Sequence, residues 1–184
     1  MLWTLSNQLT VARVALIPLL VVAFYFIADP WNHYVTAFIF ALAGFTDWLD
    51  GYLARSRGEV TPFGRFLDPV ADKLLVATTL VLLVDGHYAP AILAAIIIGR
   101  EITIGALREW LAERSSVVHV SQMGKWKTAA QLCAIEALFL HVDLLGVNMH
   151  EVGLALLWFA SILTLWSGYE YLRNAWGELS QQNV

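Results

Sequence analysis

The chain has 184 residues, of which 59% are apolar and 14% are charged. Soluble domains usually contain about 45–50% apolar and about 25% charged residues, so this composition excludes an ordinary water-soluble globule and a disordered chain. The formal net charge of -4 indicates no nucleic-acid partner, and the single cysteine, Cys133, excludes an intrachain disulfide framework.

The apolar stretches predict an all-α, polytopic membrane protein that forms one domain over residues 1–184. A transmembrane helix needs about 20 residues, which leaves room for about six spans and for no soluble catalytic domain. In chain order, the expected spans cover about 8–28, 33–54, 63–84, 89–110, 126–142 and 152–173. The first is expected to be a retained helix, because no small-residue cleavage site precedes Asp29.

The third span has its own start signal. Thr61 is a suitable N-cap, and Pro62 fits the first helical turn. An alternative start at Asp68, with Pro69 in the first turn, would leave the apolar residues before it unexplained. We therefore expect the helix to begin at Pro62 and to tolerate Pro69 as a kink.

The cations of the chain gather on one side of this map. Nine of the eleven Lys and Arg residues lie at or near the cytoplasmic ends of the expected spans. They are found near the start of the first span, at the end of the sixth, and in or next to the second and fourth connections. The other two, Lys73 and Arg100, lie inside spans. The other three connections contain acids and no cation. By the positive-inside rule, both termini and the two basic loops are expected to face the cytoplasm.

Four aspartates lie inside the expected spans, Asp47 and Asp50 in the second and Asp68 and Asp72 in the third. Each ionised carboxylate near a bilayer centre costs about 2.5–3.5 kcal/mol on insertion scales. Within each pair the spacing of three or four residues places both carboxylates on one helix face. Asp47 is about 12 Å from Arg55 at the cytoplasmic end of its helix, so water from that side can reach the acids.

If the two faces oppose each other, four carboxylates converge, and divalent cations are needed to offset their repulsion. Oxygen ligands without His or Cys favour Mg²⁺ or Mn²⁺. Such ions commonly share their coordination with substrate phosphates, which indicates phosphoryl transfer. Gly51, Ala54 and Gly64 lie beside the acids, where small residues either make room for a ligand or allow close helix packing.

The acids belong to the segments DWLDGYLAR and GRFLDPVAD, separated by eight residues. This pattern, DxxDGxxAR-x8-GxxxDxxxD, resembles the signature of the CDP-alcohol phosphotransferase family, with all eight fixed positions filled. The resemblance implies that Asp47, Asp50 and Asp68 hold a pair of divalent ions on the pyrophosphate of a CDP-linked substrate. It implies that Asp72 shares a metal or takes the proton from the incoming hydroxyl. The positions that line the cytidine nucleotide correspond to Gly51, Ala54, Arg55 and Gly64.

The segments FLDPVADK, GREITI, ALREW and GKWKT resemble family members whose acceptor is glycerol 3-phosphate. This likeness implies transfer of a phosphatidyl group from CDP-diacylglycerol to glycerol 3-phosphate, in phospholipid biosynthesis at a bacterial cytoplasmic (inner) membrane. It also implies a homodimer. The acceptor is a dianion, so its candidate partners are the cations Arg100, Arg108, Lys125 and Lys127, although the two lysines would also suit snorkelling at a helix start. Glu101 shares a helix face with Arg108 and is a possible partner for Arg100.

Three alternatives stay open. The acceptor of another family member would be serine, inositol phosphate or phosphatidylglycerol. An intramembrane prenyltransferase also uses paired aspartates around Mg²⁺-diphosphate, but with more spans and a different spacing of acids. A divalent-cation transporter would use intramembrane acids, usually near the midplane between repeated halves, whereas these halves do not repeat.

Overall fold

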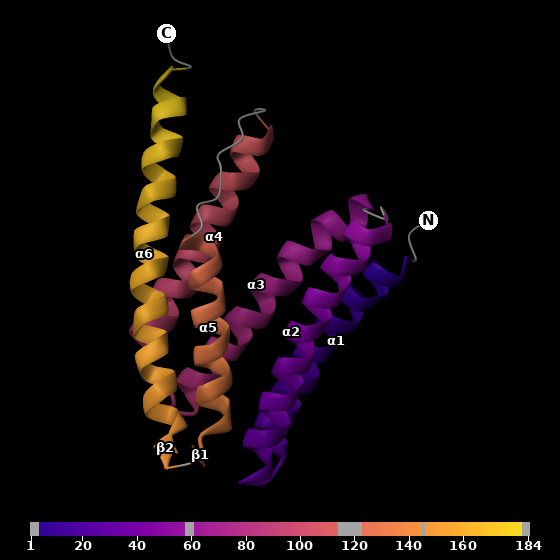
Figure 1. The fold of residues 1–184 in the computed structure, drawn as a ribbon, viewed down its shortest axis with the longest axis vertical. Coiled ribbons are helices and arrows are strands. Elements are labelled where there is room, and N and C mark those ends of the chain that lie inside the picture. The colour runs from indigo at the N-terminus through magenta and orange to yellow at the C-terminus, as the bar shows by residue number, and fades with distance from the viewer. Residues whose placement is uncertain (1–3, 58–60, 114–122, 145, 182–184) are drawn as a thin grey trace. The chain divides into compact units, whose positions relative to one another are not determined.

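The computed structural model describes residues 4–57, 61–113, 123–144 and 146–181 (Figure 1). These residues form six helices and one short β pair. The helices are α1 (Leu5–Phe26), α2 (Trp31–Arg57), α3 (Pro62–Asp85), α4 (Ala91–Glu113), α5 (Met123–Leu140) and α6 (Met149–Gln181). Strand β1 (Asp143–Leu144) pairs antiparallel with β2 (Val147–Asn148), with Asp143 opposite Asn148. The all-α class is confirmed, and each helix overlaps an expected span.

The helix starts follow local capping chemistry. The Thr61 hydroxyl accepts a hydrogen bond from the Gly64 N–H at 3.0 Å, so α3 begins at Pro62, as predicted, and it continues through Pro69. Thr4 caps α1 in the same way, by accepting from the Asn7 N–H at 3.3 Å. These caps satisfy backbone donors that a helix leaves unpaired in its first turn.

The chain divides into two compact units. The first unit contains α1, α2, α3 and residues 139–142, and α1 packs along both α2 and α3 (Figure 1). The buried residues of α1 change in character along the helix: the C-terminal half buries Leu20 and Ala23, whereas the N-terminal half buries Ser6, Asn7, Thr10 and Arg13. A buried polar face needs polar partners, and the signature aspartates of α2 and α3 are suitable partners for it.

Aromatic and histidine rings hold residues 139–142 in the first unit. The His33 ring nitrogen lies 3.2 Å from the Phe139 carbonyl oxygen, and its ring stacks on that of His141 at a centroid distance of 5.5 Å. The Tyr88 ring lies 4.9 Å from that of His141. Partial burial and the nearby Asp29 carboxylate raise the pKa of the Tyr88 hydroxyl.

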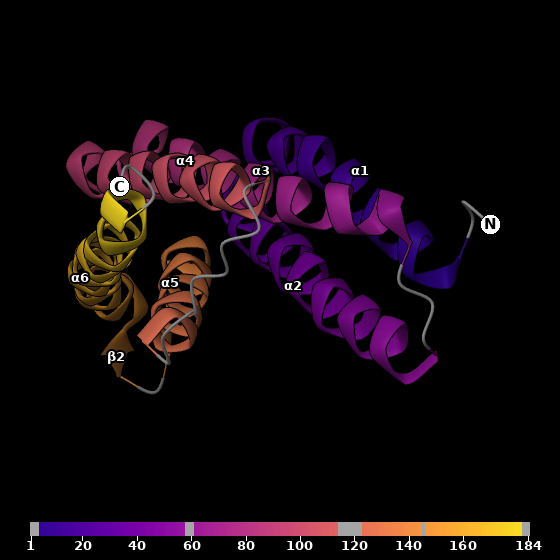
Figure 2. The same cartoon turned by 90° about the horizontal axis from the view of Figure 1, so that it is seen from above.

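The second unit contains residues 89–138 and 143–184. Helix α4 packs on α6 around Ile104, Leu111, Tyr171 and Ala175. Helix α5 runs beside α6 in both views (Figures 1 and 2), and a Cβ added at Gly153 would lie 2.7 Å from the Leu138 Cγ atom. A glycine at this position therefore allows the two helices to approach closely.

The surface of both units is strongly apolar. Phe38, Ile102 and Trp166 are 67%, 61% and 62% exposed, and they belong to a much larger set of exposed apolar side chains. Soluble monomers rarely expose so many large apolar side chains. By length and composition, two of the described helices can cross a membrane, Leu5–Phe26 and Met149–Trp176. The described residues form an all-α fold, and the arrangement in six membrane spans stays a prediction.

Candidate functional site

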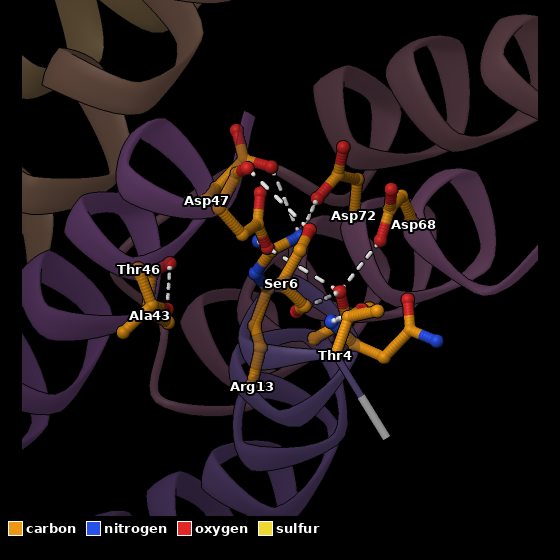
Figure 3. Close-up of polar contacts among 11 residues, drawn as sticks. Thr4, Ser6, Arg13, Ala43, Thr46, Asp47, Asp68 and Asp72 are labelled. Carbon is orange, nitrogen blue, oxygen red and sulfur yellow. Dashed lines mark hydrogen bonds and ion pairs between the residues drawn. The ribbon is translucent and has the colours of Figure 1, made fainter. Parts of the chain in front are cut away.

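Three of the four signature aspartates of α2 and α3 meet the side chain of Arg13 from α1 (Figure 3). Arg13 Nη1 lies 3.0 Å from Asp47 Oδ1 and 2.6 Å from Asp72 Oδ1. Arg13 Nη2 pairs with Asp50 Oδ2. The Arg13 side chain is completely buried, whereas those of Asp47 and Asp72 are half exposed. One guanidinium thus joins three carboxylates that lie 34 to 59 positions away in the sequence.

Thr10, almost one helical turn before Arg13, connects the fourth aspartate to this group. Its hydroxyl donates a hydrogen bond to Asp68 Oδ1 at 2.6 Å and lies 3.4 Å from Asp50 Oδ2. The Ser6 hydroxyl donates to the Asp50 carbonyl oxygen at 3.4 Å. Helix α1 therefore links the two helices that carry the signature, and the four aspartates gather along its polar face.

Sequence analysis gave no site role to this polar face. It used Arg13 only as a marker of the positive side, and it did not consider Asn7 or Thr10. A signal was nevertheless present, because Asn7, Thr10 and Arg13 recur every three residues and so share one face of a helix that is apolar from Val14 to Phe26. A charged residue inside a membrane helix also indicates a functional contact by default.

Gly64 lies buried at the start of α3, where Asn7 and Thr61 crowd its Cα atom. A Cβ at this position would lie 2.8 Å from Asn7 Oδ1 and 3.3 Å from Thr61 Oγ1. The Thr61 hydroxyl also donates to Asn7 Oδ1 at 2.9 Å. Both alternatives for this small residue stay open, because the glycine allows close packing against α1 and lies next to the turn that carries Asp68.

The other positions expected to line a nucleotide are described only in part. Gly51 follows Asp50 on α2 and is half-buried. The side chains of Ala54 and Arg55, at the end of the same helix, lie outside the described part of the structure.

The aspartate group fits a hard divalent ion by the chemistry of its donors, because it offers carboxylate oxygens and no softer ligand. The contacts to Arg13 and Thr10 use one oxygen of each carboxylate: Oδ1 of Asp47, Asp68 and Asp72, and Oδ2 of Asp50. The second oxygens take no part in these contacts. Among the described residues, no three acids, histidines or cysteines are arranged closely enough to hold an ion.

A second charged group lies in the other unit, between α4, α5 and α6. Lys127 of α5 is buried and pairs with Glu101 of α4. Arg100 Nη1 lies 3.6 Å from the same carboxylate, and Arg100 Nη2 donates to the Ser167 hydroxyl of α6 at 3.0 Å. Glu101 is therefore the acid partner of the partly buried Arg100, as sequence analysis considered.

Arg108 has a different environment from these two cations. Its guanidinium carbon lies 5.7 Å from the centroid of the Tyr171 ring, a cation–π contact, and the residue is exposed. The side chain of Lys125 lies outside the described residues. The structure thus brings Arg100 and Lys127 together around Glu101, and it leaves Arg108 an exposed residue.

Comparison with known proteins decides the family. The sequence model of the CDP-alcohol phosphatidyltransferases matches residues 3–166, which include parts of both compact units. The chain belongs to this family. It is therefore an enzyme, a transferase of phospholipid biosynthesis, and members of the family generally depend on a divalent metal.

Individual relatives of this transferase cover nearly its whole length. The CDP-diacylglycerol--glycerol-3-phosphate 3-phosphatidyltransferase of Haemophilus influenzae is 48% identical over 176 residues, which are 93% of this chain and 92% of that protein. The protein of the same name from Salmonella choleraesuis is 45% identical over 99% of this chain and 100% of its own. The cardiolipin synthase (CMP-forming) of Oryza sativa is 44% identical over 95% of this chain and 58% of its own length.

Proposed function

We propose that the chain transfers the phosphatidyl group of CDP-diacylglycerol to glycerol 3-phosphate, with release of phosphatidylglycerophosphate and CMP. The observation that carries this proposal is the convergence of the four signature aspartates on one site of the first unit. The names of the Haemophilus and Salmonella relatives, which match nearly end to end, support this donor and this acceptor.

The Oryza relative favours a second candidate within the same family. A cardiolipin synthase that forms CMP uses the same kind of leaving group, so phosphatidylglycerol is the alternative acceptor. The two candidates share the donor site and differ in the molecule that supplies the attacking hydroxyl. An acceptor assay separates them, as described below.

In the proposed site, Asp47, Asp50, Asp68 and Asp72 would hold two divalent ions, Mg²⁺ or Mn²⁺, for the pyrophosphate of the donor. Bound there, the ions would neutralise the charge that develops on the phosphates. Asp72 takes the proton from the acceptor hydroxyl, whose oxygen then bonds to the lipid-bearing phosphorus as CMP leaves. The half-exposed Asp72 side chain supports this role, since a base must be reachable by the acceptor.

The cytidine nucleotide is proposed to lie against Gly51, Ala54, Arg55 and Gly64. Their places in the signature and the absence of a side chain at Gly51 and Gly64 support this assignment. The acceptor phosphate is proposed to bind among Arg100, Arg108, Lys125 and Lys127. Of these, Arg108 is an exposed residue, whereas the charge of Lys127 is already paired with Glu101.

The proposed setting is the cytoplasmic (inner) membrane of a bacterium, with six spans in a single domain. Both termini and the active site face the cytoplasm, and two copies form a homodimer. The one-sided distribution of Lys and Arg supports this orientation. The family match across parts of both compact units supports a single domain.

The deciding experiment supplies the purified protein with CDP-diacylglycerol, Mg²⁺ or Mn²⁺, and one acceptor at a time. CMP release with glycerol 3-phosphate, and with neither serine nor inositol phosphate, is the expected result. Release with phosphatidylglycerol alone would establish the second candidate. If no acceptor gives CMP and the protein instead carries Mn²⁺ into liposomes, the chain is a transporter and the proposal is wrong.

A further inference from the structure

Arg13 lies outside the family signature and on a different helix from all four signature aspartates, yet it contacts three of them. We propose that Arg13 is a positioning residue, which orients Asp47, Asp50 and Asp72 for binding of a divalent ion. The inference rests on the proposed function in one respect, namely that these aspartates are the metal ligands.

The contacts of the guanidinium have the geometry that positioning requires. Arg13 engages Oδ1 of Asp47, Oδ1 of Asp72 and Oδ2 of Asp50, so the opposite oxygen of each carboxylate takes no part in these contacts. A guanidinium holds its N–H donors in a rigid plane, and each hydrogen bond therefore limits the rotation of the carboxylate that accepts it. Carboxylates that bind metals are commonly oriented by such outer partners.

Burial makes the position of the guanidinium well defined. The Arg13 side chain has no exposure, and Asp50, its most buried partner, is 3% exposed. A buried charge is tolerated only when it is paired and hydrogen-bonded. The same residue thus stabilises the packing of α1 between α2 and α3, because its three partners come from both of those helices.

The carboxylates and Arg13 together keep a net negative charge that can attract a metal ion. Four carboxylates carry four negative charges when ionised, and Arg13 supplies one positive charge. The remaining negative charge attracts a divalent cation, and partial neutralisation by Arg13 lowers the repulsion that would otherwise push the carboxylates apart. Arg13 and a bound ion are therefore expected to act together.

A competing interpretation predicts the opposite effect of removing Arg13. If the guanidinium only occupies the place of the ion, its removal vacates that place and increases the negative potential, so the ion should bind more tightly. If Arg13 orients the ligands, its removal lets the carboxylates turn and separate, so the ion should bind more weakly. The sign of the change in metal affinity distinguishes the two interpretations.

The experiment titrates Mn²⁺ into the purified full chain without any substrate and follows free Mn²⁺ by electron paramagnetic resonance. Loss of a partner that orients a metal ligand typically lowers metal affinity about 10–100-fold, and we expect this loss for Arg13→Gln. Arg13→Lys keeps the charge without the planar fork and is expected to fall between Arg13→Gln and the wild type. Arg173→Gln is the matched control, because it removes an exposed cation of α6 and should bind Mn²⁺ like the wild type.

A kinetic readout accompanies the binding measurement. The apparent KM for Mn²⁺ should rise in Arg13→Gln, and a high Mn²⁺ concentration should restore part of the turnover rate. A loss of folded protein would lower the turnover rate at every Mn²⁺ concentration and would not show this recovery. Circular dichroism and thermal melting without metal check the fold of each variant. If Arg13→Gln does not fold, the comparison of Arg13→Lys with the wild type carries the test.

The outcomes separate this inference from the proposed function. Unchanged or tighter Mn²⁺ binding in Arg13→Gln overturns the positioning role while the wild-type site stands. Wild-type affinity in Arg13→Lys also overturns it, because charge alone would then suffice. If the wild type itself binds no Mn²⁺, the metal assignment in the proposed function is wrong, and the inference falls with it. A mistaken acceptor affects none of these results, since no acceptor is present.

Discussion

Replacing Gly64 with alanine tests whether close packing against α1 requires a glycine at this position. The new Cβ would lie 2.8 Å from Asn7 Oδ1, closer than real Cβ contacts come. Asn7 is 2% exposed, and its Oδ1 atom accepts the Thr61 hydroxyl at 2.9 Å, so it cannot move aside without weakening the cap of α3. The alanine must therefore displace a buried, hydrogen-bonded side chain.

The magnitude follows from two opposing effects. Overpacking of this kind costs about 1–3 kcal/mol. Replacing a helical glycine with alanine returns roughly 0.5–1 kcal/mol, because the unfolded chain loses freedom. Gly64→Ala should therefore lower the free energy of unfolding by up to about 2 kcal/mol. In an Asn7→Ala background the obstructing oxygen is gone, so Gly64→Ala should leave the free energy of unfolding unchanged or raise it.

The assay is a double-mutant cycle on the purified protein in detergent, unfolded with increasing denaturant and followed by circular dichroism. Gly44→Ala on α2 is the control, because a Cβ there meets nothing within 4 Å and should not destabilise the protein. A coupling energy between positions 7 and 64 below about 0.5 kcal/mol would refute the packing argument. A double variant that regains stability but keeps a raised KM for CDP-diacylglycerol would support the nucleotide role of Gly64 separately.

Three further predictions concern catalysis, metal and packing. Asp72→Asn should lower kcat about 10²–10⁴-fold while CDP-diacylglycerol binding stays measurable, and near-normal turnover would remove Asp72 from the role of base. Chelation with EDTA should stop CMP release and added Mg²⁺ or Mn²⁺ should restore it, so activity that persists in EDTA would contradict the metal sites. Gly153→Ala should lower the free energy of unfolding by up to about 2 kcal/mol, because its Cβ would lie 2.7 Å from the Leu138 Cγ atom, and an unchanged denaturation midpoint would show that α5 and α6 can separate.

Local sequence signals predicted the helices well, since they depend on residues that are neighbours in the chain. The Thr61 cap and Pro62 placed the start of α3, and the helix continues through Pro69 as expected. The ends were less predictable. Helix α6 continues to Gln181, beyond the expected span, because polar residues extend a helix past its apolar stretch without a signal in hydropathy.

The charged contacts outside the signature were not predictable in the same way. Lys127 and Glu101 are 26 positions apart, and nothing in either segment indicates that α5 brings one to the other. The spacing of Glu101 and Arg108 suggested a shared face, but the structure pairs Glu101 with Lys127 and Arg100 and places Arg108 over Tyr171. Such pairing depends on which helices become neighbours.

The sequence by itself determined the class of protein, the helices and the family, because composition, apolar length and the spacing of four aspartates are properties of the chain. Helical periodicity also placed each pair of aspartates on one face. Only the tertiary structure decided what joins the two pairs. Helix α1 packs along both α2 and α3 and buries Arg13 among their carboxylates, and a buried cation takes its partners from whichever acids the packing brings within reach.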